Sequence, residues 1–170
     1  GLTQNAGEAE ITGLEVDFTW LATDNLTLTG AATLLDAELS EDFFQNVNPG
    51  PMDIPDAPSG TQLPSVPDYK AYVSGRYEQE FSGYDTFYSA TYSIVGSRYN
   101  DLFVAAREEQ DSYGILNASA GFGKNDWRVS FFANNITDER AELFRNAVDF
   151  DARITTNRPR SFGVSLSQDF

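Results

Sequence analysis

The sequence predicts an all-β fold, in which about seven antiparallel strands form an up-and-down segment of a transmembrane β-barrel. Three observations lead to this fold class. Apolar and polar residues alternate along most of the 170 residues, as they do in strands with one face in an apolar medium. The connections between these segments are short and long in turn. Aromatic residues make up 14% of the chain, yet no apolar run reaches the ~18 residues of a membrane helix.

Seven alternating segments follow one another, each long enough for a tilted membrane strand. They cover residues 10–22, 25–38, 68–81, 85–97, 112–123, 126–136 and 160–170. In the first three, the apolar face consists of Leu14, Val16, Phe18 and Trp20, then Leu26, Leu28, Gly30, Ala32 and Leu34, then Tyr69, Ala71, Val73, Gly75 and Tyr77. The positions between them are mostly polar or small, so each strand has one face for lipid and one for the barrel lumen.

The later four segments repeat this pattern. Their apolar faces consist of Tyr88, Ala90, Tyr92 and Ile94, then Leu116, Ala118, Ala120 and Phe122, then Trp127, Val129, Phe131 and Ala133, then Phe162, Val164, Leu166 and Phe170. Charged residues at the opposite positions are expected to line the lumen, and they are Glu15, Asp17, Arg76, Glu78 and Arg128.

The connections favour a membrane barrel over a soluble sandwich. Residues 23–25, 82–84 and 124–126 are tight turns of Asp, Asn, Ser and Gly with few other residues. The other connections are long and cover residues 39–67, 98–111 and 137–159. Membrane barrels have short periplasmic turns and longer extracellular loops. We therefore expect the long loops to face outward and the last strand to end on the periplasmic side.

Composition excludes several classes of function. The chain has no cysteine and no histidine, which removes thiolate nucleophiles, Cys/His metal sites and histidine bases, and we expect neither an enzyme, a cofactor nor a metal site. A net charge of −15 argues against a nucleic-acid partner. Residues 1–69 contain twelve carboxylates and no Lys or Arg. The chain begins at Gly1 without a signal peptide, so we expect it to be part of a longer polypeptide.

Three stretches together resemble the C-terminal third of TonB-dependent receptors. The first runs from Asn5 to Val16 and continues through Asp24-Asn25-Leu26-Thr27-Leu28 and Leu35-Asp36-Ala37. The second is Asn134-Asn135-Ile136-Thr137-Asp138, similar to the family's Asn-Leu-Thr-Asp. The third is Arg158-Pro159-Arg160-Ser161-Phe162-Gly163-Val164, which leads to the terminal Phe170.

The resemblance implies a 22-stranded barrel around an N-terminal plug, in the outer membrane of a Gram-negative bacterium. The whole of residues 1–170 would be the C-terminal portion of the barrel, with the plug and the earlier strands absent. Such a receptor imports a scarce nutrient of the siderophore, vitamin or oligosaccharide class, with energy supplied through the TonB complex by way of the absent N-terminal part. Other implied partners are outer-membrane lipid, lipopolysaccharide and the barrel assembly machinery.

Two groups of residues are candidate sites. Phe162, Val164, Leu166 and Phe170 match the assembly signal of outer-membrane proteins, although Gln168 stands where an apolar residue is common. The loop of residues 39–67 is a candidate for extracellular ligand contact, because long loops often carry function. Its candidate residues are Glu41, Asp42, Phe43, Phe44, Asp53 and Asp56. In the loop of residues 137–159, mixed charges favour surface ion pairs.

Two alternatives remain open from the residues alone. One is a complete small outer-membrane barrel with a structural or adhesive role, which would need an eighth strand. The other is a soluble β-sandwich that binds carbohydrate, in which Trp20, Trp127 and tyrosines would stack on sugars. A strict short and long order of loops is not expected of a sandwich.

Overall fold

The fold is built from β-strands alone in the part of the chain that the computed structural model describes, which is residues 7–46, 48–146, 151 and 153–169. No helix in this part is long and apolar enough to cross a membrane. The strands are β1 (Ala9–Thr23), β2 (Leu26–Leu39), β3 (Tyr69–Phe81), β4 (Tyr84–Val95), β5 (Arg98–Tyr99), β6 (Glu109–Gln110), β7 (Tyr113–Lys124), β8 (Trp127–Asn134), β9 (Glu142–Arg145), β10 (Ile154–Thr156) and β11 (Ser161–Gln168).

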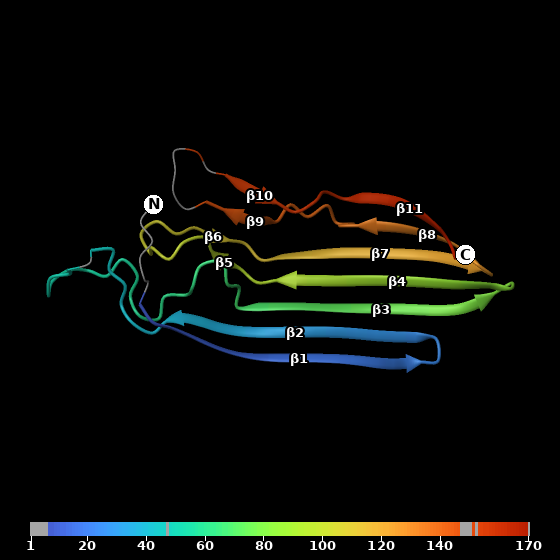
Figure 1. Ribbon diagram of the computed structural model, residues 1–170, viewed down its shortest axis with the longest axis horizontal. Helices are drawn as coiled ribbons and strands as arrows, with labels where there is room; N and C mark the ends of the chain where they lie inside the picture. Colours follow the sequence, from blue (N-terminus) through green and yellow to red (C-terminus); the bar gives the residue numbers. More distant parts are fainter. Residues whose placement is uncertain (1–6, 47, 147–150, 152, 170) are drawn as a thin grey trace.

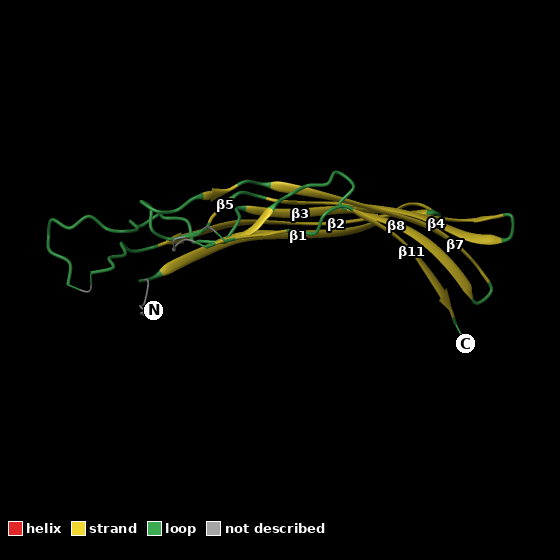
Figure 2. Cartoon of the chain, turned by 90° about the horizontal axis from the view of Figure 1, so that it is seen from above, coloured by secondary structure: helices red, strands yellow, loops and turns green. Residues whose placement is uncertain are grey.

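Seven of these strands form one antiparallel sheet in the order β1-β2-β3-β4-β7-β8-β11. Each strand pairs with the next long strand along the chain, which is the up-and-down topology that the sequence predicts (Figure 1). The sheet is a single curved layer (Figure 2), not the two packed layers of a sandwich. It is also open, because β1 and β11 lie at opposite edges. Neither the closed small barrel nor the sandwich describes this arrangement.

Strand register confirms the two-sided pattern. Val16 pairs with Ala32, and Ala32 pairs with Ala71 on β3. Partners across an antiparallel pair point to the same side of the sheet, so the apolar faces predicted for the seven strands lie on one side, which we call the outer face. Asp17 pairs with Ala31, and Arg128 on β8 pairs with Ser167, on the opposite or inner face.

The tight turns form at the positions that the sequence predicts. Between Phe81 and Tyr84, which pair with each other, Ser82 and Gly83 have φ angles of 53° and 75°. Two consecutive positive φ angles are the mark of a type I′ turn, whose twist matches that of the flanking strands. All three tight turns lie at one end of the sheet, the turn end, and the three long connections lie at the other, the loop end (Figure 1).

The structure differs from the sequence prediction in the long connections and near the C-terminal edge. Two small hairpins, β5–β6 and β9–β10, lie within connections that the sequence predicts only as long loops. β8 and β11 have eight residues each, fewer than the 9–11 expected, because the chain turns away after Asn134 into the motif described below. Most large apolar side chains of the sheet are exposed, and the buried apolar residues lie at the loop end.

Candidate ligand-binding loops at the loop end of the sheet

The first long connection, residues 40–68, folds around a small apolar core at the end of β2. Leu39, Phe43 and Ala57 are buried, and Leu63, Leu102 and Phe103 pack against them. The ring centroids of Phe43 and Phe103 are 6.0 Å apart. Because Leu102 and Phe103 belong to the second connection, residues 96–112, this apolar core holds the first two loops together.

Backbone hydrogen bonds reinforce this contact. Phe43 donates its amide N–H to the carbonyl of Ala57 at 2.7 Å. Val104 donates to the carbonyl of Asp56 at 3.1 Å, and Ser65 donates to Tyr99 at 2.8 Å. The last two bonds join the first loop to the second, so their relative position is fixed by both apolar packing and the backbone.

Three of the predicted ligand-contact carboxylates hold the backbone of their own loop. Asp42 accepts a hydrogen bond from the amide of Ser59 at 2.8 Å, and Asp56 accepts one from Gln45 at 2.8 Å. Asp53 accepts one from Gly50 at 2.7 Å. Carboxylate oxygens that accept backbone N–H groups fix loop geometry in the same way as a helix cap does. The predicted residue Phe43 is buried in the loop core, Phe44 is half-buried, and Glu41 is exposed.

The exposed tip of this loop carries two apolar residues that the sequence analysis did not select. Met52 is 94% exposed and Ile54 is 87% exposed. Asp53 stands between them, and the amide of Asp53 donates to the carbonyl of Gly50 at 3.1 Å. Two hydrogen bonds between Gly50 and Asp53 thus hold the turn that exposes Met52 and Ile54. In the sequence, the Pro-Met-Asp-Ile-Pro stretch carries the only available signal.

The second and third long connections are joined through Arg98 of β5, which is 6% exposed. Its guanidinium donates to the carbonyls of Glu142 and Leu143 at 2.7 and 3.1 Å. The guanidinium carbon also lies 5.9 Å from the ring centroid of Tyr113. A buried arginine that donates hydrogen bonds to the backbone carbonyls of another segment holds that segment in place.

A charged network connects the same two loops at the surface. Arg145 forms ion pairs of 2.6 Å with both Glu108 and Glu142. The hydrogen bond from Arg145 lowers the pKa of the Glu142 carboxyl below its ordinary value, and it raises the pKa of Arg145. The sequence-based expectation of surface ion pairs in this loop is therefore confirmed for Arg145.

The stretch that resembles the family's Asn-Leu-Thr-Asp is a compact clamp at the end of β8. Asn135 is 4% exposed and has a φ of 50°, and Asp138 has a φ of 56°. The side-chain amide of Asn135 donates to the carbonyls of Glu139 and Arg158 at 2.9 and 3.0 Å, and its oxygen accepts from the amide of Glu139. Asparagine adopts left-handed backbone angles more often than most residues do.

Asp138 completes the clamp. Its carboxylate accepts a hydrogen bond from the amide of Arg160 at 2.9 Å, which lowers the pKa of this carboxyl; the ion pair with Arg140 at 3.3 Å lowers it further. The start of the loop and the approach to β11 are thus held at one point. We name Asn135 and Asp138, with the segments that they hold, the β8–β11 clamp.

The residues of the predicted assembly signal lie on the edge strand β11. Phe162, Val164 and Leu166 are 72%, 63% and 64% exposed on the outer face. They pair with Ala133, Phe131 and Val129 of β8. Phe170 lies outside the described residues. Phe162, Val164 and Leu166 thus extend the apolar outer face to the edge of the sheet, because β11 pairs with β8 alone in the described sheet.

The single antiparallel layer with an apolar outer face, tight turns at one end and folded loops at the other defines the wall of a transmembrane β-barrel. Residues 1–136 match the family model for the TonB-dependent receptor-like β-barrel. The chain belongs to this family, whose members are receptors and transporters of the Gram-negative outer membrane, not a class of enzymes.

Solved structures with the same fold include three receptors. The ferric yersiniabactin uptake receptor FyuA from Yersinia pestis has a TM-score of 0.79 and 21% identity, and the match covers 98% of this chain and 24% of that one. BauA, the ferric preacinetobactin receptor from Acinetobacter baumannii, has a TM-score of 0.70 and 20% identity, and the match covers 97% of this chain and 23% of that one. The siderophore receptor PiuA from the same organism has a TM-score of 0.68 and 24% identity, and the match covers 94% of this chain and 22% of that one. The chain thus spans about a quarter of the length of these receptors.

Proposed function

We propose that this chain is the C-terminal portion of the barrel of a TonB-dependent receptor that imports a ferric siderophore, and that it has no enzymatic activity. The full receptor would contain earlier strands and a plug, and it would take energy from the TonB complex. In this proposal the loop end faces the outside of the cell and the turn end faces the periplasm. Support for the siderophore class comes from FyuA, described as a ferric yersiniabactin uptake receptor, from BauA, a ferric preacinetobactin receptor, and from PiuA, a siderophore receptor.

The proposal that the loops bind the ligand is supported by the contacts that connect the three long loops. Phe43 packs on Phe103, and Arg98 donates to the carbonyl of Glu142, so one unit extends from β2 to β11. Loops that are already ordered lose little conformational entropy when a ligand binds. The apolar tip at Met52 and Ile54 is the part of this unit that we assign to ligand contact.

An uptake assay with the full-length receptor tests this proposal. The receptor is produced in an iron-limited strain that lacks its own siderophore receptors, and uptake of radioactive iron is measured with a panel of ferric siderophores. We expect uptake of one chemical class, and loss of uptake when TonB is deleted. Uptake of a vitamin or an oligosaccharide without any uptake of iron would contradict the siderophore class.

Loop variants of the same receptor test the site. The double substitution Met52→Ser and Ile54→Ser is expected to weaken ligand binding without affecting assembly, because both side chains are almost fully exposed. Phe81→Ser is the control, since Phe81 is 66% exposed but lies next to a tight turn, at the turn end of the sheet. Equal ligand affinity of the double variant and the control would remove the tip from the binding site.

A further inference from the structure

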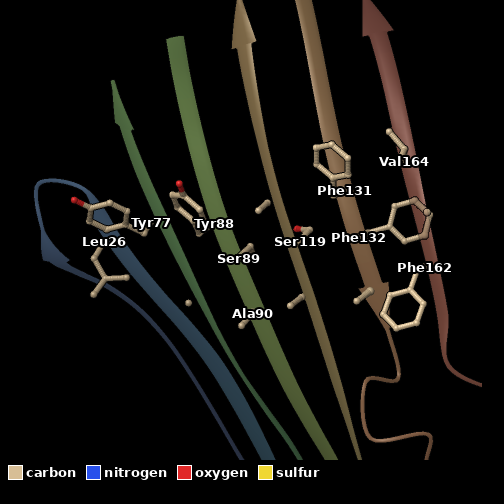
Figure 3. A pocket seen from close by; sticks show the side chains of 15 residues that line it. Leu26, Tyr77, Tyr88, Ser89, Ala90, Ser119, Phe131, Phe132, Phe162 and Val164 are labelled. Atoms are coloured by element: carbon tan, nitrogen blue, oxygen red, sulfur yellow. The ribbon is translucent and has the colours of Figure 1, made fainter. Parts of the chain in front are cut away.

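The inner face of the sheet has an uncharged part on its central strands. No inner-face residue from Phe87 to Val95 on β4, or from Tyr113 to Gly123 on β7, is charged. Most side chains there are short and polar, and we call six of them the hydroxyl wall: Ser89, Thr91 and Ser93 on β4, Asn117 and Ser119 on β7, and Ser130 on β8. The large rings of these strands, such as Tyr88, are outer-face residues (Figure 3).

Register makes these residues one continuous surface. Ser89 pairs with Ser119, and Thr91 pairs with Asn117. The second pair belongs to a longer row, in which Thr19 pairs with Thr29, Thr29 with Ser74, and Ser74 with Thr91. Polar side chains therefore follow one another across five strands at the same height in the sheet.

The hydroxyl wall has unused hydrogen-bonding capacity. Thr91 shares a hydrogen bond of 2.8 Å with Ser74. Within the described part of the chain, the hydroxyls of Ser89, Ser93, Ser119 and Ser130 have no protein partner, and all four residues are half-buried. A hydroxyl can both donate and accept, so this wall offers several neutral and interchangeable contacts to a group in the lumen.

Charged residues on the inner face lie beside the hydroxyl wall, on other strands. They are Glu15 and Asp17 on β1, and Lys70, Arg76, Glu78 and Glu80 on β3. Arg76 and Glu78 form an ion pair of 2.8 Å. The change from a charged to an uncharged inner face therefore occurs between β3 and β4.

At the turn end, the hydroxyl wall leads to a polar pocket of about 440 Å³. Arg76, Phe87 and Arg128 are among its lining residues. The guanidinium carbon of Arg76 lies 4.5 Å from the centroid of the Phe87 ring. Arg128 is exposed and has no hydrogen bond or ion pair with any described residue. The wall thus has an accessible polar space at its lower end.

We propose that the imported ferric complex crosses the lumen along the hydroxyl wall of β4, β7 and β8 and leaves past Arg128. Transport requires contacts that are favourable enough for entry but weak and numerous enough for release. Neutral hydroxyls provide such contacts, whereas the charged positions of β1 and β3 would retain a group of opposite charge. This inference rests on the transport function proposed above, and it adds the route within the barrel.

A bulky substitution in the full-length receptor tests the route. Thr91→Trp narrows the wall, and Thr19→Trp, in the same row on β1, is the matched control. Binding and uptake are measured with radioactively labelled ferrichrome, ferrioxamine B and ferric enterobactin in cells with equal receptor levels. We expect Thr91→Trp to lower uptake at least tenfold at unchanged binding affinity, and Thr19→Trp to transport normally. Replacing Ser89, Ser93, Ser119 and Ser130 together by alanine is expected to lower uptake several-fold.

Cysteine labelling tests the route without a bulky side chain. In a full-length receptor without other cysteines, Thr91→Cys and Thr19→Cys are exposed to a membrane-impermeant maleimide during uptake. Thr91→Cys should be labelled several-fold faster in cells with TonB than in cells without it, and Thr19→Cys at equal rates. Equal uptake by the two tryptophan variants, or TonB-dependent labelling at Thr19→Cys alone, overturns the route and leaves the transport function standing. No iron uptake by the unmodified receptor contradicts the transport function itself, and the route with it.

Discussion

The ring of Phe132 on β8 covers Gly163, its cross-strand partner on β11. A side-chain carbon at position 163 would overlap the ring. The same arrangement occurs where Phe87 on β4 covers its partner Gly121 on β7. An aromatic ring over a glycine of the neighbouring strand fixes register, because a shift by one residue would place a side chain under the ring.

Gly163→Val is expected to destabilise the last strand pair by about 1–3 kcal/mol, since it forces overpacking against Phe132. The measurement is the midpoint temperature at which the folded full-length receptor loses its fast migration in gel electrophoresis. Ser165→Val, two residues further on the same strand and face, is the control. If Gly163→Val and Ser165→Val shift the midpoint equally, the position of the Phe132 ring does not require a glycine at position 163.

Asn135→Ala is expected to loosen the β8–β11 clamp. The substitution leaves the Glu139 amide and the Arg158 carbonyl without their partner. Both bonds are partly buried, so the loss approaches the lower end of the about 1–3 kcal/mol that a buried unsatisfied group costs. Limited trypsin digestion should cut faster after Arg140, Arg145 or Arg153. Asn134→Ala, at the neighbouring exposed position, should be cut at the rate of the unmodified receptor.

Asn135→Gly separates the two contributions of this residue. Glycine accepts the φ of 50° but has no amide. Digestion as fast as in Asn135→Ala would show that the hydrogen bonds of the side-chain amide stabilise the clamp. Digestion at the unmodified rate would assign it to the backbone conformation and would contradict the role given to the side-chain amide.

Phe43→Ala is expected to release two loops together, because Phe43 packs on Phe103 of the second loop. Hydrogen exchange should become faster in residues 40–46 and 98–111 alike. Met52→Ala is the control, since Met52 is 94% exposed. Faster exchange confined to the first loop would contradict the common core.

Acid is expected to weaken the contact between the second and third loops. The pKa of Glu142 is lowered in the folded state, so this contact contributes its full stability above the ordinary pKa of a glutamate and loses it as the pH falls through the lowered value. This chain has no cysteine, so a spin label at Phe144→Cys, in a full-length receptor without other cysteines, reports the mobility of this loop. Mobility should rise on acidification. Glu142→Gln should be mobile at neutral pH, and an unchanged spectrum would contradict the ion pair's role.

The sheet could be predicted from the sequence because alternation depends only on the medium at each face. The register of Tyr77 with Tyr88, for example, follows from the apolar pattern and from the tight turn at Ser82 and Gly83. The loops could not be predicted in the same way. Asp42, Asp53 and Asp56 could be selected only as members of a long acidic loop, whereas their hydrogen bonds to backbone amides 17, 3 and 11 residues away appear only in the folded loop. Such contacts have no sequence period, and neither do the short hairpins β5–β6 and β9–β10.

The motif at Asn135 illustrates the same limit. Its resemblance to a family pattern pointed to the position, whereas its role required the contacts with Glu139 and Arg158. These partners are 4 and 23 residues away along the chain. Gly75, Ala90, Ala118 and Ala133 likewise form one row of small residues on the outer face only because four strands are in register.

Accessibility of spin labels along β4 of the full-length receptor in lipid vesicles tests the membrane wall most directly. Labels at Tyr88, Ala90 and Tyr92 should collide with oxygen dissolved in the bilayer, and labels at Ser89, Thr91 and Ser93 should not, because these residues alternate between the outer and inner faces. A strict alternation in oxygen accessibility with a period of two is the predicted result. Equal accessibility at all six positions would contradict a β-barrel wall with one face in lipid.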